Sequence, residues 1–159
     1  MKYIDTKIVF SEVPDEITLA INISGCPIHC ADCHSKYLWE DKGNNLDDKE
    51  LLRLIKSNSG ITCVSFMGGD DRETELQLLA KCVKENTKLK VAWYSGRSYF
   101  QLINFNYSLF DYVKIGDYRA DRGPLNNPNT NQKMFKLDVL PNNFIGMINI
   151  TNKFWKQNV

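Results

Sequence analysis

The chain has 159 residues, an ordinary length for one domain, so we expect a single domain that spans residues 1–159. Its formal net charge is +1, which favours neither nucleic acid nor an anionic membrane surface as a partner. Hydrophobic residues make up 43% of the chain, but no apolar run approaches the ~18 residues of a membrane span, and the first residues carry acids where a signal peptide is apolar, so we expect a cytoplasmic protein.

The first predicted elements are a strand and a helix, separated by a cysteine-rich segment. Residues 17–24 read as a strand that runs into Gly25 and the cysteines. A helix follows, because Asp47 and Glu50 have capping-box spacing and aliphatic residues recur at helical intervals until residues 57–60 end the helix. The cysteines therefore lie just beyond the carboxyl end of a strand.

Strands and helices then alternate along the chain. The predicted elements are a strand over 61–67 that ends at Gly68-Gly69-Asp70, a helix over 73–86, a strand over 89–94, a short helical stretch over 99–104, and strands over 112–115, 133–140 and 146–151. Alternation of this kind implies a parallel sheet with right-handed crossovers. Because a closed eight-stranded barrel needs ~250 residues, we expect an α/β fold in which mainly parallel strands form a partial, open barrel.

Glycines mark the junctions that follow the predicted strands, at Gly25, Gly68, Gly69, Gly96 and Gly116. Parallel sheets bind ligands outside the carboxyl ends of their strands, and glycine there allows a close backbone approach or a positive φ. Glycine also ends elements without any further role, and for Gly96 or Gly116 alone that interpretation is preferred. Their agreement with the cysteine segment favours a ligand site along one edge of the sheet.

The segment 24–34, SGCPIHCADCH, holds three of the five cysteines and both histidines. It has three interpretations: three thiolates for an iron–sulfur cluster, a Cys/His zinc site, or the C-x-x-C-H signature of covalent haem. Disulfides are rare in the cytoplasm, and covalent haem is normally attached outside it. Structural zinc sites usually take ligand pairs from two separated segments, whereas all candidates here lie in one loop. Three thiolates suit a [4Fe–4S] cluster with one open iron.

The two remaining cysteines are isolated in the sequence. Cys63 lies in a predicted strand and Cys82 on the apolar face of a predicted helix, so we expect both to be buried. The polar segment 119–132 is rich in turn formers, and either docks a partner or is an ordinary solvated connection.

These motifs resemble the radical S-adenosylmethionine enzymes. The resemblance rests on cysteines spaced C-x3-C-x2-C after the first strand and on a Gly-Gly-acid turn after the second. Within that superfamily the chain is similar, over most of its length, to the anaerobic (class III) ribonucleotide reductase activating proteins. The matching features are the small size, Trp39, and the segments 92–96, 116–118 and 129–132.

The resemblance implies a partial radical S-adenosylmethionine barrel and a specific chemistry. Cys26, Cys30 and Cys33 would ligate three irons of a [4Fe–4S] cluster, and the methionine end of S-adenosylmethionine would chelate the fourth. One electron, from a donor such as flavodoxin or ferredoxin, would cleave the cofactor to methionine and a 5′-deoxyadenosyl radical. That radical would take a hydrogen atom from a glycine of the anaerobic ribonucleotide reductase catalytic subunit.

The resemblance also implies a set of cofactor-binding residues. Gly68 and Gly69 match the backbone that pairs with the methionine end of the cofactor, and Asp70 would accept a hydrogen bond from its amine or else cap the following helix. His34 would stack on the adenine, and Ser95 would contact the ribose or the carboxylate. Trp39 would shield the cluster or pack in the core.

The chain departs from the family pattern at three positions. Asp71 stands where relatives often have proline, Asp32 stands where they often have an apolar residue, and the acid near Gly116 follows the glycine instead of preceding it. The alternatives are another small radical S-adenosylmethionine enzyme, such as an activase for a different glycyl radical enzyme or a 7-carboxy-7-deazaguanine synthase, and a zinc-binding module without catalysis.

Overall fold

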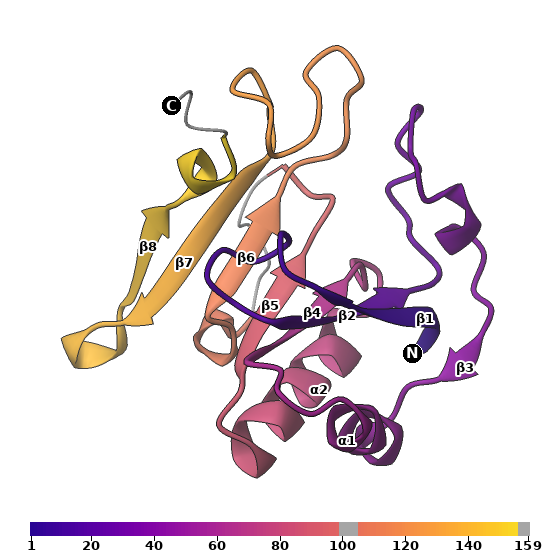
Figure 1. The fold of residues 1–159 in the computed structure, drawn as a ribbon, viewed down its shortest axis with the longest axis vertical. Coiled ribbons are helices and arrows are strands. Elements are labelled where there is room, and N and C mark those ends of the chain that lie inside the picture. The colour runs from indigo at the N-terminus through magenta and orange to yellow at the C-terminus, as the bar shows by residue number, and fades with distance from the viewer. Residues whose placement is uncertain (99–104, 156–159) are drawn as a thin grey trace.

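The computed structural model describes residues 1–98 and 105–155, and the predicted helical stretch over 99–104 lies outside them. Eight strands form one sheet in the order β3-β1-β2-β4-β5-β6-β7-β8, with two α-helices on one side of it (Figure 1). The strands are β1 (Lys2–Val9), β2 (Thr18–Ile23), β3 (Asn44–Asn45), β4 (Cys63–Met67), β5 (Lys90–Tyr94), β6 (Tyr112–Ile115), β7 (Lys133–Val139) and β8 (Ile145–Asn149). The helices are α1 (Asp48–Ser57) and α2 (Glu73–Asn86), with 3-10 turns at Lys36–Leu38, Tyr107–Leu109, Pro141–Asn143 and Thr151–Phe154.

The sheet is mixed, so the expectation of mainly parallel strands is wrong. The central strands β2, β4, β5 and β6 are parallel to one another, as the alternation of strands and helices predicts. Strands β1 and β3 extend one edge in antiparallel pairings, and β7 and β8 extend the other. Antiparallel neighbours need no crossover helix, which explains how a chain with only two described α-helices builds eight strands.

The helices begin and end where their sequences indicate. The Asp47 side chain accepts a hydrogen bond from the backbone N–H of Glu50 at 2.9 Å, which caps α1. The carboxylate of Glu50 turns away to Arg53 and to the hydroxyl of Tyr3, so the second half of the capping box does not form. Helix α2 has the predicted bounds, and its N-cap is Arg72.

The main hydrophobic core lies between the helices and one face of the sheet. It joins leucines of α1 and α2 to alternate residues of the parallel strands, because successive strand residues point to opposite faces. A second, smaller core on the other face contains Val13 from the β1–β2 loop, Leu125 from the loop before β7 and Ile150 after β8. Loops therefore cover the face that the helices leave free. Cys63 and Cys82 are both buried, as predicted.

A buried acid ties the amino ends of the strands together. The Glu16 carboxylate accepts hydrogen bonds from the hydroxyls of Thr62 and Tyr112 and pairs with Lys90. Burial raises the pKa of Glu16, but the bonds from Lys90, Thr62 and Tyr112 outweigh it and leave that pKa lowered. This network stabilises the fold far from the cysteine segment.

Stability should therefore fall in acid through Glu16. Because the folded-state pKa is lowered, the contribution is present above the unfolded-state pKa of about 4.3 and is lost as the pH falls through the folded value. We expect Glu16→Gln to lower the free energy of unfolding at pH 7 by about 1–3 kcal/mol and to flatten its decline below pH 5. Thermal unfolding of both proteins between pH 3 and 7 measures this, and parallel curves would contradict it.

Within the described residues, neither α-helix has the length and apolar character that a membrane crossing requires.

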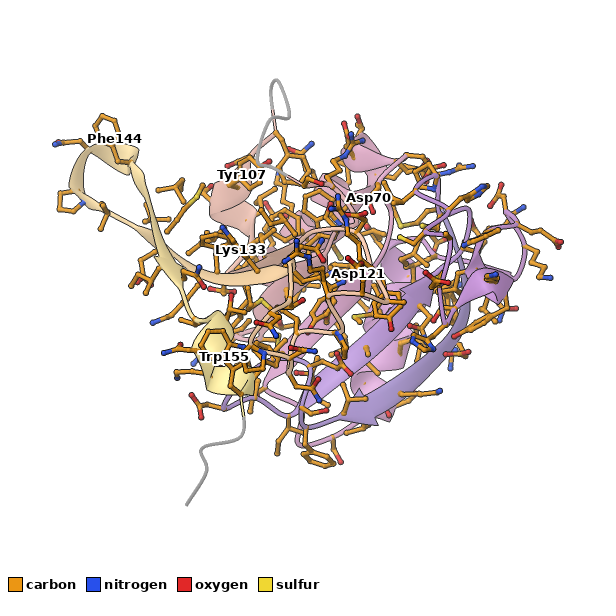
Figure 2. All side chains as sticks on the ribbon, turned by 90° about the horizontal axis from the view of Figure 1, so that it is seen from above. Asp70, Tyr107, Asp121, Lys133, Phe144 and Trp155 are labelled. Carbon is orange, nitrogen blue, oxygen red and sulfur yellow. The ribbon has the colours of Figure 1, made fainter. Side chains whose placement is uncertain are left out.

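Figure 2 shows Phe144 at the far tip of the connection between β7 and β8, whereas Asp70 lies in the body of the fold.

Candidate metal centre

The segment after β2 and the segment after β6 leave the sheet at the same edge, as Figure 1 shows. This edge holds the carboxyl ends of the four parallel strands. Four of the five junction glycines, Gly25, Gly68, Gly69 and Gly116, have positive φ there. Four of the predicted junctions therefore have the glycine conformation that the sequence indicates, and a ligand site along this edge stays a prediction.

Gly96 is the exception, and its role is close approach. A Cβ atom at this position would lie 2.6 Å from Cγ1 of Ile28, which is between the first two cysteines. The segment of residues 25–40, here called the cysteine loop, thus packs directly on the turn that follows β5.

We expect Gly96→Ala to displace the cysteine loop. The added methyl group overlaps the branched side chain of Ile28, and overpacking of this kind costs about 1–3 kcal/mol. Iron and acid-labile sulfide per chain after anaerobic reconstitution should fall in Gly96→Ala and recover in the double variant with Ile28→Ala, which removes Cγ1 and Cγ2 of Ile28 and leaves only its Cβ, at 3.1 Å. Full iron content in the single variant would show that the contact does not hold the loop.

Backbone hydrogen bonds close the cysteine loop on itself. The N–H of Cys26 donates to the carbonyl of Leu38 at 3.0 Å, and the N–H of Cys33 donates to the carbonyl of Cys30 at 3.0 Å. All three cysteines are free thiols of intermediate exposure. The loop thus presents Cys26, Cys30 and Cys33 on one short, closed segment.

The backbone around the cysteines offers amide donors to their sulfur atoms. The N–H of Ser35 donates to Sγ of Cys33 at 3.3 Å. Burial raises the pKa of Cys26, while hydrogen bonds from the backbone of Ile28 and His29 oppose that rise. Amide donors to sulfur are a means by which proteins tune iron–sulfur clusters.

The donor set fits an iron–sulfur cluster by its chemistry. Within residues 1–98 and 105–155, no three Cys, His, Asp or Glu side chains already stand in the arrangement of a bound metal ion. The fit therefore rests on three free thiols in one loop, one of which accepts an amide hydrogen bond. In addition, the buried indole N–H of Trp39 has no hydrogen-bond acceptor among the residues that the structure describes. A donor of this kind is costly unless something accepts its hydrogen bond.

Both histidines contact aromatic rings. The ring of His29 stacks on Trp39, with centroids 4.5 Å apart, and Trp39 is half-buried at the loop, outside the main core. His34 meets the ring of Tyr118 edge-on at 4.8 Å. The structure thus places His34 between the last cysteine and the turn after β6, where an adenine contact stays a prediction.

Asp70 and Ser95 are brought together, with about 1% of each residue exposed. The Ser95 hydroxyl donates to Oδ1 of Asp70 at 2.5 Å, and the N–H of Gly96 donates to Oδ2 at 3.2 Å. Arg97 donates to the Asp70 carbonyl at 2.6 Å. Burial raises the pKa of Asp70, and the hydrogen bonds from Ser95 and Gly96, with the charges of Arg97 and Lys114, only partly offset that rise. Asp70 thus joins the turns after β4 and β5, and the alternative that it caps α2 is wrong because Arg72 holds the N-cap position.

Both the N–H and the carbonyl of Gly68 form hydrogen bonds with residues of β5. Its N–H donates to the carbonyl of Tyr94 at 3.0 Å, and its carbonyl accepts from the indole of Trp93 at 3.0 Å. The turn of residues 68–70 is thereby held in place before any ligand binds. A turn that is fixed in this way needs little reorganisation, and its contact with a cofactor stays a prediction.

Lys114 is a buried cation at the same edge, and the sequence analysis missed it. Its Nζ donates to the carbonyls of Gly116 at 2.6 Å and Ser95 at 3.4 Å. The available signal was a lysine inside the predicted strand over 112–115, since buried parallel strands are otherwise apolar.

The segment 129–132 packs against the turn after β6. Asn131 donates to the carbonyl and the carboxylate of Asp117, and Gln132 donates to the carbonyl of Gly116. A Cβ atom on Gly116 would lie 3.0 Å from Cα of Gln132, so glycine allows this close packing.

A family model describing a 4Fe-4S single cluster domain matches residues 17–135. The chain belongs to this 4Fe-4S family. The matched part begins next to β2 and ends in β7, so it includes the cysteine loop and every parallel strand. No curated protein and no solved structure matches the chain. Membership in the 4Fe-4S family favours the iron–sulfur interpretation of the cysteines over zinc and haem.

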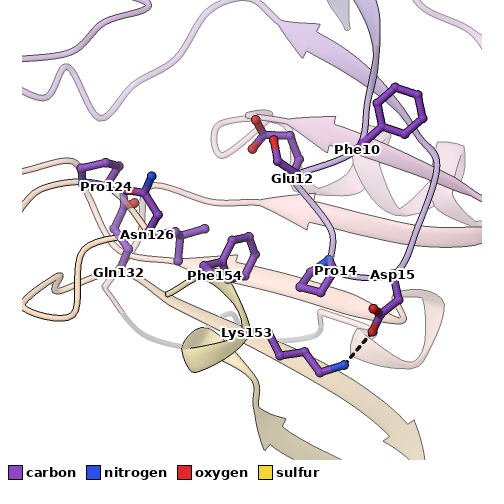
Figure 3. A pocket seen from close by; sticks show the side chains of 11 residues that line it. Phe10, Glu12, Pro14, Asp15, Pro124, Asn126, Gln132, Lys153 and Phe154 are labelled. Carbon is purple, nitrogen blue, oxygen red and sulfur yellow. Dashed lines mark hydrogen bonds and ion pairs between the residues drawn. The ribbon is translucent and has the colours of Figure 1, made fainter. Parts of the chain in front are cut away.

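A cavity of about 690 Å³ opens elsewhere on this 4Fe-4S protein, between the β1–β2 loop and the residues around β7 and β8 (Figure 3). Phe10, Glu12, Pro124 and Phe154 contribute to its lining, and an ion pair of Lys153 with Asp15 crosses one side at 2.7 Å. No cysteine lines this cavity. Gln132 belongs both to its wall and to the contact with the turn after β6, so the cavity borders that turn.

Proposed function

We propose that this 4Fe-4S protein is a radical S-adenosylmethionine enzyme that activates anaerobic ribonucleotide reductase. The observation that carries the proposal is the packing of the cysteine loop on Gly96, next to the preorganised turn of residues 68–70, at the carboxyl edge of the parallel strands. A reduced [4Fe–4S] cluster with one open iron would supply the electron that cleaves S-adenosylmethionine and so starts glycyl radical formation on the reductase.

The residues of the chain divide into ligands and positioning groups. Cys26, Cys30 and Cys33 hold the cluster. The backbone of residues 68–70 would hold the methionine end of S-adenosylmethionine next to the cluster. Asp70 and Ser95 fix the relative position of the two turns through their hydrogen bond, so they act on the cofactor mainly by orienting the backbone around it.

The adenine end of the cofactor lies towards the turn after β6 in this proposal. His34 is exposed and already contacts Tyr118, so the two rings offer a stacking surface for a planar base. Asp32, which replaces the apolar residue of the family pattern, is exposed and leaves this surface to His34.

The partner docks on the face that the helices leave free. The loop of residues 119–132 and the cavity beside Phe154 lie on that face, and Gln132 joins them to the turn after β6. This surface accepts the reductase segment that carries the reacting glycine. A flavodoxin or ferredoxin reaches the cluster from the exposed side of the cysteine loop, at Pro27 and Ala31.

The test of the proposal is a glycyl radical on the reductase. The reconstituted protein, a low-potential one-electron reductant, S-adenosylmethionine and the catalytic subunit of an anaerobic ribonucleotide reductase are combined without oxygen, and electron paramagnetic resonance is recorded. We expect the glycyl radical doublet, and its absence when S-adenosylmethionine is omitted. Cleavage of S-adenosylmethionine without that doublet would assign the chain to a different small radical S-adenosylmethionine enzyme.

A further inference from the structure

Lys114 is a buried charge for which the described structure offers no ionic partner. About 8% of the residue is exposed, and within residues 1–98 and 105–155 no carboxylate forms an ion pair with it. The carboxylates of Asp70 and Asp117 act on its charge electrostatically, without forming an ion pair with it. Two backbone carbonyls are its hydrogen-bond acceptors. A buried ammonium that is held only by carbonyl dipoles is unfavourable, so the fold keeps it at a cost.

The position of Lys114 links it to the cysteine loop. In the sheet it is paired with Tyr94, whose ring lies 5.9 Å from Nζ, and both residues lie on the face without helices. Its acceptor Ser95 precedes Gly96, on which Ile28 of the cysteine loop packs. One buried cation therefore stands behind the turn that supports the cysteines.

Cys30 and Cys26 are among the groups that act on the charge of Lys114. Burial lowers the pKa of Lys114 to about 8, and the opposing causes include Cys30 and Cys26 as well as the two acids. At neutral pH the amine is therefore still largely protonated. The cation lies within electrostatic reach of two of the three predicted cluster ligands.

A [4Fe–4S] core held by three thiolates carries a net negative charge, and one electron from a low-potential donor makes that charge more negative by one. A nearby buried cation stabilises the reduced form more than the oxidised form, and it does so strongly because little water screens it. We propose that Lys114 is the counter-charge that this fold provides for its cluster, and that it raises the cluster's reduction potential. The inference rests on the 4Fe-4S assignment alone, and it holds whether or not the partner is a ribonucleotide reductase.

The test is a redox titration of the reconstituted protein without S-adenosylmethionine and without a partner. The reduced cluster is quantified by electron paramagnetic resonance at each poised potential. Lys114→Met keeps a side chain of similar length and removes the charge. We expect it to lower the midpoint potential by at least about 59 mV, a tenfold change in the one-electron equilibrium constant. Lys114→Arg, which keeps the charge, should restore most of the difference.

The matched control is Lys36→Met. Lys36 lies three residues after Cys33 but is exposed, so water and salt screen its charge and the midpoint should move much less. Equal midpoints for Lys114→Met and the wild type, at equal iron content, would overturn the proposal, as would equal shifts in Lys114→Met and Lys114→Arg. If Lys114→Met does not take up a cluster, Lys114→Gln, which retains N–H donors for the two carbonyls, carries the same prediction and the same refutation.

Discussion

Cys30→Ala is expected to abolish S-adenosylmethionine cleavage. Cys30 is the middle cysteine of the loop, and its removal leaves two thiolates, which do not hold a [4Fe–4S] cluster with a single open iron. The backbone of the loop should survive, because the bond in this turn runs from the N–H of Cys33 to the carbonyl of residue 30 and not to its side chain. The loss is therefore one of ligation.

The measurement compares three proteins after anaerobic reconstitution with iron and sulfide. Iron, acid-labile sulfide, 5′-deoxyadenosine and methionine are quantified for the wild type, Cys30→Ala and Cys82→Ala. Cys82 is buried on α2 and serves as the matched control, since it is also a cysteine but packs in the main core. We expect cleavage to fall to background in Cys30→Ala and to persist in Cys82→Ala.

Two outcomes would contradict this account. Cleavage retained by Cys30→Ala would show that the cysteine loop is not the catalytic ligand set. A wild-type protein with full cluster content and no cleavage would make the loop an electron-transfer or structural centre. The first outcome would leave the cleavage chemistry but remove its assignment to the cysteine loop, and the second would leave membership in the 4Fe-4S family but remove the radical chemistry.

Local sequence signals were sufficient for the central part of the fold. The capping residue Asp47, the apolar spacing in α2 and the glycines after each strand correctly predicted both helices and the four parallel strands. These signals act within a few residues, so they can be read without knowing the tertiary structure.

Strands β7 and β8 at one edge were predicted as strands, but strands β1 and β3 at the other edge, and the antiparallel pairings of both edges, escaped the sequence analysis for a physical reason. Strand β1 mixes lysines and acids with its apolar residues, and its pairing with β2 depends on the β1–β2 loop, where Val13 is fully buried against the second core. Pairing decided by such distant contacts leaves no periodic pattern in the strand itself. The mixed character of the sheet follows from these edge strands.

The candidate site was predicted in its parts but not in its connections. The glycines and cysteines can be recognised in the sequence by their spacing. The hydrogen bond between Ser95 and Asp70 cannot, because it joins residues 25 positions apart and depends on the register of β4 with β5. Lys114 was missed because its burial and its contacts with Ser95 and Gly116 depend on the tertiary structure. The resemblance to a family pointed to Asp70 and Ser95 as cofactor contacts, and the structure adds that each is the other's partner.

Asp70→Ala is expected to damage both the fold and the binding of S-adenosylmethionine. The substitution leaves the buried Ser95 hydroxyl and the partly buried Gly96 N–H without their acceptor, at up to about 1–3 kcal/mol for each group. The turns after β4 and β5 then lose their common anchor. We expect the free energy of unfolding of the metal-free protein to fall by about 3–5 kcal/mol, as when one partner of a buried charged network is removed.

Two measurements separate a positioning role of Asp70 from direct contact with the cofactor. They are the free energy of unfolding of the metal-free protein, from chemical unfolding, and the affinity of the reconstituted protein for S-adenosylmethionine. Ser95→Ala should reproduce part of the loss of stability and part of the loss of binding. The double variant of Asp70→Ala with Ser95→Ala should lose less than the sum of the two single variants, since the two side chains share one hydrogen bond. Asp71→Ala is the control, because this exposed neighbour should change stability by less than about 0.5 kcal/mol. Weaker binding in Asp70→Ala with unchanged stability would instead make Asp70 a direct ligand of the cofactor amine, because a side chain that only positions the two turns cannot be removed without destabilising them.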